Sequence, residues 1–333
     1  MTENKNYNYK PLPEPIPITK QLWPEGTLPL VHTRTMTYMH ESYIKECIEG
    51  ILMQKTTFPV HVLIHDDAST DRTAEIVKEY ELKYPHLIKA YYQKENSHTE
   101  KDKSERRVEF TRMQIGKYEA LCEGDDYWTD PLKLQKQTMF MEGNSGYSLC
   151  YHKHKHLKNG MLSESIPSKG KDFSGMELIG TPGGIAMCTK FFINVYNNPK
   201  IPQNEIMTGD YAFNAYLGTH GNAKFLADIK PSVRRWHSGG VWTTRSDLKK
   251  LTASLNGKIK VYNYFKKSKN EELIKVSIMA IYNKISESIH LIETNKVQRH
   301  SGILRFKIFG VIVEINHKNG LQTLKKIKAK LKF

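Results

Sequence analysis

Two pairs of adjacent carboxylates, each directly after an apolar run, constrain this chain more than any other feature. The pair Asp66-Asp67 follows the run at residues 60–64, and the pair Asp125-Asp126 follows the run at 118–122. A buried strand that ends in acids delivers them to one edge of its sheet, and open α/β sheets bind ligands at that edge. The two pairs therefore predict a sheet edge that holds a cation and an anionic ligand.

The elements around these acids alternate between two hydrophobic patterns. Short apolar runs predict strands at residues 29–38, 60–64, 87–92 and 118–122. Helical spacing of apolar residues predicts helices at 40–54, between Asp71 and Pro85, and at 131–141. Strands that alternate with helices are typical of a parallel sheet flanked by helices, so we expect an α/β fold.

Beyond residue 143 the pattern is weaker. Alternation at 147–157 predicts one strand, on which His152, His154 and His156 share a face. We expect this face to be exposed, and a metal-binding histidine cluster is the alternative. Residues 210–217 predict a helix and 223–229 a strand.

The last part of the chain has a different character. Isoleucines at helical spacing predict a long, packed helix at 273–292. We expect three parts: an extended, proline-rich lead-in at 1–28, an α/β domain at 29–245, and a helical, basic extension at 246–333.

The net charge of +15 belongs mostly to the end of the chain, since residues 296–333 hold ten Lys or Arg and one Glu. Residues 321–333 combine an apolar stripe with lysines, which fits either a solvated face or docking on an anionic membrane surface. No apolar run approaches the roughly 20 residues of a membrane span. The polar, proline-containing first 21 residues are not typical of a signal peptide. We therefore expect a cytoplasmic protein, with peripheral association with the inner face of the plasma membrane as a further hypothesis.

The pair Asp125-Asp126 is the sharpest candidate site. Mg²⁺ and Mn²⁺ prefer carboxylate oxygens and retain water or phosphate ligands. A surface turn is the alternative, but Tyr127 and Trp128 beside the acids favour a site. At the first pair, Asp71 or Ser69 can cap the following helix, which would leave both acids free for a ligand.

Two later candidates depend on context. The segment Arg234-Arg235-Trp236-His237 carries an imidazole, a common metal ligand, and two arginines that can bind phosphates. By its pattern alone, however, this segment is a loop histidine with solvated arginines. Asp210, before a predicted helix, is by its pattern alone a helix cap.

The residues quoted so far resemble glycosyltransferase family 2, of GT-A fold, over roughly residues 29–245. Two motifs carry the resemblance: the strand that ends in His-Asp-Asp-Ala-Ser-Thr-Asp at 65–71, and Cys-Glu-Gly-Asp-Asp-Tyr-Trp at 122–128. The resemblance implies a GT-A (Rossmann-like) mixed, mostly parallel sheet flanked by helices, to which the C-terminal helical extension is added. It also implies an inverting enzyme that transfers a hexosyl or N-acetylhexosaminyl group from a nucleotide-sugar, with a UDP-sugar expected.

The resemblance also assigns roles to individual residues. Asp67 and Tyr38 would bind the donor base, and Asp125 the ribose or sugar. Asp126 would bind the divalent cation, Mn²⁺ or Mg²⁺. The remaining assignments are Asp210 as the general base, His237 at the metal or diphosphate site, and Arg235 at the donor.

The expected acceptor is a hydroxyl of a glycan or of a lipid-linked saccharide in surface polysaccharide biosynthesis. One alternative is a basic nucleic-acid-binding protein, although the basic tail lacks stacking aromatics and we expect no nucleic acid partner. The other is a nucleotidyltransferase, which would need a glycine-rich loop after the first strand. Arg34 and Glu119 depart from the apolar residues expected at their positions, and a buried arginine is costly unless it is paired.

Overall fold

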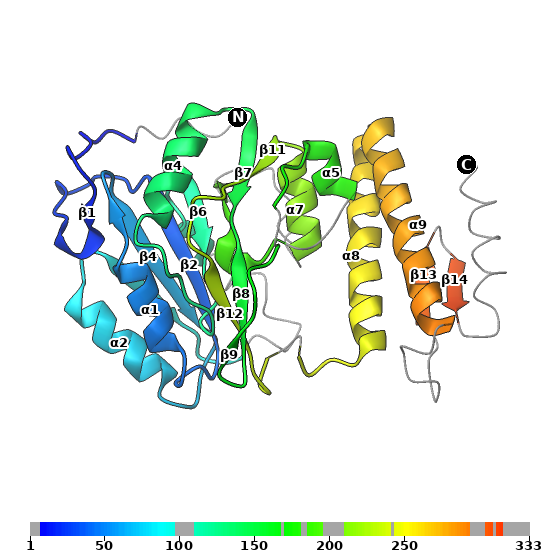
Figure 1. Ribbon diagram of the computed structural model, residues 1–333, viewed down its shortest axis with the longest axis horizontal. Coiled ribbons are helices and arrows are strands. Elements are labelled where there is room, and N and C mark those ends of the chain that lie inside the picture. Colours follow the sequence, from blue (N-terminus) through cyan, green and yellow to red (C-terminus); the bar gives the residue numbers. More distant parts are fainter. Residues whose placement is uncertain are drawn as a thin grey trace. The chain divides into compact units, whose positions relative to one another are not determined.

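The structure, a computed structural model, describes residues 7–96, 110–167, 170–180, 185–195, 210–240, 243–293, 304–308 and 311–315 (Figure 1). The chain forms two compact units, which are described separately. The first comprises residues 1–172, 184–201 and 221–236, and the second comprises 173–183, 202–220 and 237–333. The domain boundaries predicted at residues 28 and 245 are a separate division, and they remain predictions.

Seven strands from the described residues form the main sheet of the first unit. In spatial order they are β11 (Asn222–Phe225), β7 (Tyr147–Tyr151), β10 (Phe191–Ile193), β6 (Tyr118–Leu121), β2 (Val31–Thr37), β4 (Val60–Asp66) and β5 (Ile88–Tyr92). Strand β10 is antiparallel to both of its neighbours, and every other adjacent pair is parallel. The predicted mixed, mostly parallel sheet is confirmed, and the carboxyl ends of β2, β4 and β6 share one edge.

Three helices pack on one face of this sheet: α1 (Ile44–Leu52), α2 (Thr73–Lys83) and α4 (Lys133–Gly143) (Figure 1). Their apolar side chains form one core with those of the sheet. The core includes Ile44, Cys47, Ile48, Ile51, Val77, Tyr80, Leu134 and Met141 from the helices, and Val31, Val62, Ile64, Ile88, Ala120 and Phe191 from the strands. This burial fixes the sheet edge on which the acid pairs lie.

Helix α1 begins later than the pattern predicted. Residues 40–43 form a turn instead, in which the His40 carbonyl accepts hydrogen bonds from the N–H groups of Tyr43 and Ile44. The Thr73 hydroxyl accepts from the His40 N–H at 2.8 Å and so holds the turn against α2. His40 therefore lies in a loop at the carboxyl end of β2, not in a helix.

The single strand predicted at 147–157 is two strands in different sheets. β7 belongs to the main sheet, whereas β8 (His154–Lys158) pairs with β12 (Ser232–Trp236) and β9 (Met161–Leu162). The chain changes sheet at His152-Lys153, where the Lys153 carbonyl accepts from the Ser232 N–H. The prediction of an exposed histidine face was wrong for His152 and His154, which are 1% and 4% exposed. His152 Nε2 lies 3.4 Å from the Ser232 hydroxyl, and His154 pairs with Ser232 of β12.

The lead-in is held to the first unit by a short pairing of β1 (Ile16–Pro17) with β3 (Lys55–Thr56), followed by the single turn η1 (Ile18–Lys20). A second short turn, η2 (Met187–Thr189), precedes β10.

The second unit is mainly helical. It contains α5 (Gly175–Gly180), α7 (Asp210–Gly218), α8 (Asp247–Ser268), α9 (Glu271–Glu293) and the hairpin of β13 (Leu304–Ile308) with β14 (Val311–Ile315). The packed helix predicted at 273–292 is α9, in which Ile281, Ile285 and Ile289 are buried. Within the described residues, no helix is long and apolar enough to cross a membrane. The predicted amphipathic segment 321–333 lies outside the described residues.

Candidate functional site

In the turn after β4, Asp66 has a structural role. Asp66 is buried, and its carboxylate accepts hydrogen bonds from the Ser69 N–H at 3.0 Å and the Ser69 hydroxyl at 2.6 Å. Asp71 accepts from the N–H of Thr73, the first residue of α2, while the N-cap position of this helix is Arg72. The expectation that both acids would be free was therefore wrong for Asp66, which shapes the turn.

Asp67 and Tyr38, the predicted base-binding residues, lie at the ends of neighbouring strands. The Asp67 N–H donates to the Thr37 carbonyl at 3.0 Å, so the two turns are joined directly. Tyr38 follows β2, and its side chain is 44% exposed. Both residues are thus at the sheet edge where their predicted role requires them, and the role itself stays a prediction.

The loop after β6 continues along β2 and passes close to His40. The Gly124 N–H donates to the Met36 carbonyl at 2.9 Å. A Cβ atom at Gly124 would lie 2.7 Å from Thr37 Oγ1 and 2.8 Å from His40 Nδ1. Only glycine permits this approach without displacing a neighbour, and it brings the acid pair beside the His40 turn.

The two acids of this loop face different surroundings. Asp126 is buried, and its Oδ1 accepts a hydrogen bond from the Arg235 N–H at 3.0 Å. Burial, and next the charge of Asp125, raise the pKa of Asp126 well above its ordinary value, although the Arg235 N–H opposes this shift. Asp125 is only partly buried.

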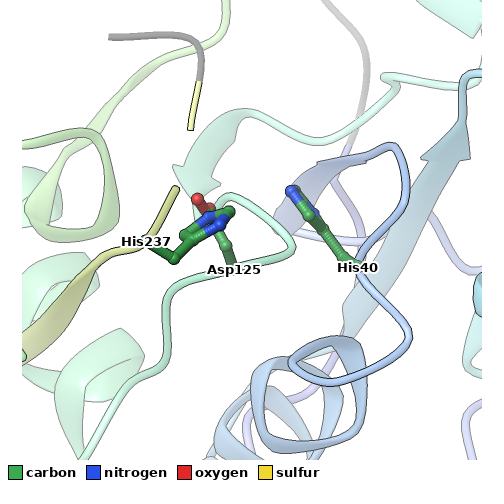
Figure 2. A group of neighbouring side chains, drawn as sticks. All are labelled: His40, Asp125 and His237. Carbon is green, nitrogen blue, oxygen red and sulfur yellow. The ribbon is translucent and has the colours of Figure 1, made fainter. Parts of the chain in front are cut away.

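Three side chains from distant parts of the sequence converge here: His40, Asp125 and His237 (Figure 2). Each offers one ligand atom, and these atoms all lie within 4.8 Å of one another. Opposite ligands of an ion with bonds of about 2.1 Å are roughly 4 Å apart, so the spacing suits a cation after small adjustments. His237 directly follows Trp236, the last residue of β12, so this strand determines the position of its backbone.

The donor set fits a transition-metal cation. Mg²⁺ favours oxygen ligands only, whereas imidazole together with carboxylate also suits Mn²⁺ and its neighbours in the first row. His40 Nδ1 lies 3.2 Å from Thr37 Oγ1, and such outer contacts orient metal-binding imidazoles. Among the described residues, this group is the one cluster of three or more His, Cys, Asp or Glu with such spacing.

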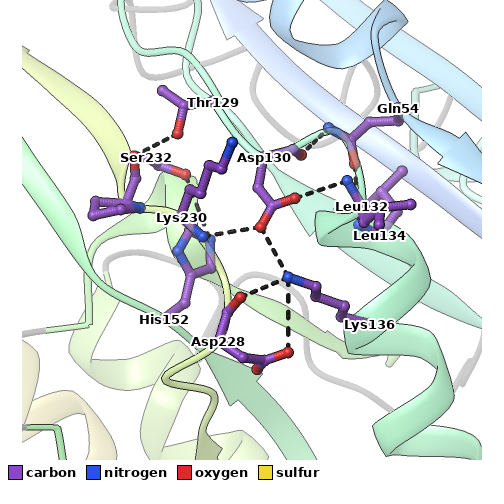
Figure 3. Close-up of polar contacts among 11 residues, drawn as sticks. Gln54, Thr129, Asp130, Leu132, Leu134, Lys136, His152, Asp228, Lys230 and Ser232 are labelled. Atoms are coloured by element: carbon purple, nitrogen blue, oxygen red, sulfur yellow. Dashed lines mark hydrogen bonds and ion pairs between the residues drawn. The ribbon is translucent and has the colours of Figure 1, made fainter.

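Strand β12 is held beside the loop by a polar network around Asp130 (Figure 3). The Asp130 carboxylate accepts from the Lys230 N–H at 2.9 Å, the Leu132 N–H at 2.9 Å and the Lys136 ammonium at 3.1 Å. Burial alone would raise the pKa of Asp130, but these three donors hold it below its ordinary value. Tyr127 and Val233 then exchange two backbone hydrogen bonds, which fix β12 against the acid loop.

The sequence-predicted residues are thus only partly brought together. Asp125 and His237 lie in the candidate metal group, and Asp126 and Arg235 contact each other beside it. Asp210 belongs to the second unit, where it is the exposed first residue of α7. Sequence reasoning missed His40, although its place just after a strand end was an available signal.

Comparison with known proteins assigns a family to part of the chain. The profile of Glycosyl transferase family 2 matches residues 35–195, which include both acid pairs. Over these residues, the chain belongs to glycosyl transferase family 2. The family match includes His40 and Asp125 and ends before β12 and His237.

Two solved structures of S. aureus TarS 1-349 show that the fold of this family 2 chain is GT-A. The complex with UDP is 19% identical in sequence, covers 80% of this chain and 73% of that chain, and has a TM-score of 0.55. The complex with UDP-GlcNAc is 17% identical, covers 86% of this chain and 96% of that chain, and has a TM-score of 0.54. At these identities the likeness concerns the fold alone.

The sequence relatives of the chain include bacterial proteins. An uncharacterised protein of Mycobacterium tuberculosis is 32% identical over 211 residues, which are 62% of this chain and 59% of that protein. TuaG of Bacillus subtilis, named for a glycosyltransferase role in teichuronic acid biosynthesis, is 35% identical over 127 residues, or 36% of this chain and 48% of TuaG. The chain thus spans about three fifths or less of these relatives.

Proposed function

We propose that this family 2 chain is an inverting glycosyltransferase that uses a UDP-sugar. The acceptor in this proposal is a hydroxyl of a glycan or lipid-linked saccharide in surface polysaccharide biosynthesis. The observation that carries the proposal is the group His40, Asp125 and His237, which lies at the carboxyl edge of the sheet and beside the turn of Asp67. The UDP and UDP-GlcNAc held by TarS support the choice of nucleotide, and the role named for TuaG supports the choice of pathway.

The chain's own residues divide the work of donor binding. Asp67 and Tyr38 bind the base, at the joined turns after β4 and β2. His40, Asp125 and His237 hold a divalent cation, for which we propose Mn²⁺. When bound, that cation neutralises charge on the leaving diphosphate. In this assignment Asp125 replaces Asp126 as the carboxylate ligand, because it is an Asp125 oxygen that lies within 4.8 Å of the ligand atoms of His40 and His237.

The transfer itself is a single displacement. The acceptor oxygen bonds to the anomeric carbon as the bond from that carbon to the diphosphate oxygen breaks. We propose that Asp210 takes the proton of the acceptor hydroxyl and that the nucleoside diphosphate leaves with the electron pair. Attack from the face opposite the leaving group inverts the anomeric configuration. Association of the basic residues 296–333 with an anionic membrane surface remains part of the proposal, since it would bring the chain to a lipid-linked acceptor.

Calorimetric titration of UDP-sugars, with and without Mn²⁺, tests this function. We expect metal-dependent binding of one UDP-sugar to the full chain, weakened at least about tenfold by Asp125→Asn because a metal ligand is lost. Asp126→Asn is the matched control, since it changes the neighbouring acid, and we expect it to keep most of the affinity. Loss of binding in Asp126→Asn alone would return the ligand role to Asp126. Absence of binding by every nucleotide-sugar would refute the proposal.

A further inference from the structure

Arg235 is the residue at which three segments of the candidate site meet. Its backbone N–H donates to Asp126 Oδ1 at 3.0 Å, and its Nη1 donates to the Asp125 carbonyl at 2.7 Å. Its Nη2 forms an ion pair with the Glu46 carboxylate of helix α1. One arginine therefore connects β12, the acid loop and α1.

Two aromatic rings enclose the same guanidinium. Its central carbon lies 4.7 Å from the centroid of Tyr127 and 5.2 Å from that of Tyr43. Only 8% of the side chain of Arg235 is exposed. A planar guanidinium can donate in two directions while its faces contact rings, which an ammonium cannot do.

These contacts link two of the three candidate metal ligands. Asp125 is held through its own carbonyl, and His237 follows two residues after the Arg235 N–H that is fixed on Asp126. We propose that Arg235 is a positioning residue that sets the spacing between Asp125 and His237, rather than a ligand of the donor diphosphate. The metal part of this inference rests on the proposed function.

The hydrogen bonds of the guanidinium support this role over phosphate binding. Nη1 donates to the Asp125 carbonyl and Nη2 pairs with Glu46, and with 8% of the side chain exposed little of the guanidinium is accessible to a diphosphate. Outer contacts of this kind change metal affinity by about 10- to 100-fold when they are removed, because the ligands lose their relative positions.

The test compares Mn²⁺ affinity, measured by calorimetry on the full chain, among four variants. We expect Arg235→Met to weaken Mn²⁺ binding at least about tenfold, and Arg235→Lys to restore little of it, because an ammonium reproduces only part of the fork. Glu46→Gln keeps a hydrogen-bond acceptor and should have a smaller effect in the same direction. Arg72→Met is the control, since Arg72 forms an exposed ion pair with Glu75 and should leave Mn²⁺ binding unchanged.

Hydrogen exchange of the amides at residues 123–128 gives a readout that needs no metal. We expect these amides to exchange faster in Arg235→Met than in the wild type, with little change in the thermal melting temperature. If Arg235→Met does not fold, the same comparison is made with Glu46→Gln. Wild-type exchange in these variants would overturn the inference, as would wild-type Mn²⁺ affinity in a folded Arg235→Met. Weaker binding of metal-free UDP to Arg235→Met with an unchanged loop would make Arg235 a diphosphate ligand instead. If the wild-type chain binds no Mn²⁺, the proposed metal site fails, and the exchange result still decides whether Arg235 holds the loop.

Discussion

Arg34 and Glu119, the two residues that depart from an apolar sheet, compensate each other. Arg34 Nε donates to Glu119 Oε1 at 2.5 Å, and His32 Nε2 lies 3.3 Å from Glu119 Oε2. Burial alone would raise the pKa of Glu119, but Arg34 and then His32 hold it below its ordinary value. The sequence shows each departure separately, and it cannot show the pair because 85 residues separate the partners.

Removing one partner of this pair should cost more than removing both. We expect Glu119→Leu to lower the free energy of unfolding by about 3 to 5 kcal/mol, because it breaks the buried ion pair between Arg34 and Glu119. The double variant Arg34→Met/Glu119→Leu should recover part of that loss, measured by urea denaturation. Lys117→Met is the control, because its ion pair with Glu142 is exposed and worth about 1 kcal/mol or less. If the loss of unfolding free energy in the double variant equals the sum of the losses in the two single variants, the pair is not coupled.

At the scale of elements, the loop after β6 depends on its close approach to the His40 turn. We expect Gly124→Ala to push His40 or Thr37 aside, since its Cβ would lie under 3 Å from both side chains. Mn²⁺ affinity should fall about tenfold through the displaced imidazole, as it does when an outer contact is lost. Calorimetry on the folded variant measures this change. Gly143→Ala, where a Cβ meets nothing within 4 Å, is the control, and equal affinities in both variants would exclude His40 from the metal group.

The elements that the sequence predicted are those whose patterns are local. The strands β2, β4, β5 and β6 follow apolar runs, and α9 follows an isoleucine stripe. Strand β12 was missed because its Arg234-Arg235 pair interrupts any apolar pattern, and its conformation comes from pairing with β8 and Tyr127. The division of β7 from β8 has the same origin, since a partner distant in sequence decides which sheet each strand joins.

At the scale of the whole molecule, buried and partly buried histidines make stability depend on pH. Burial, then His32 and Lys89, lower the pKa of His61 from 6.5 to about 4. Burial and His156 lower that of His154 to about 4 as well. The folded state therefore favours neutral imidazoles. Their stabilisation is complete above about pH 6.5 and is lost as the pH falls towards 4, because the unfolded chain takes up the protons first.

Unfolding free energies measured by urea denaturation between pH 7.5 and 4.5 test this dependence. We expect stability to fall over that range and His61→Gln to flatten the slope, since His61 alone contributes at most about 3 kcal/mol. His86→Gln is the control at an exposed histidine, and it should keep the wild-type slope. An identical slope in His61→Gln would show that His61 is not responsible.

The acids of the candidate site were predictable from local patterns, and His237 only through the family resemblance. Asp67 and Asp125 were identified because each follows an apolar strand, and strand ends are local features. The choice between Asp125 and Asp126 as metal ligand, and the presence of His40, depend on contacts with Arg235 and Gly124. Such contacts join segments more than 80 residues apart, so no pattern along the sequence expresses them.

The pairing of β12 with Tyr127 also determines when, during folding, the candidate cation site can form. The contacts Tyr127–Val233 and Asp126–Arg235 close loops of more than 100 residues, and such closures are slow steps in folding. During synthesis, the strands and helices up to α4 leave the ribosome long before residue 237 does. A nascent chain that stops short of β12 can therefore bury much of its core while the candidate cation site still lacks His237.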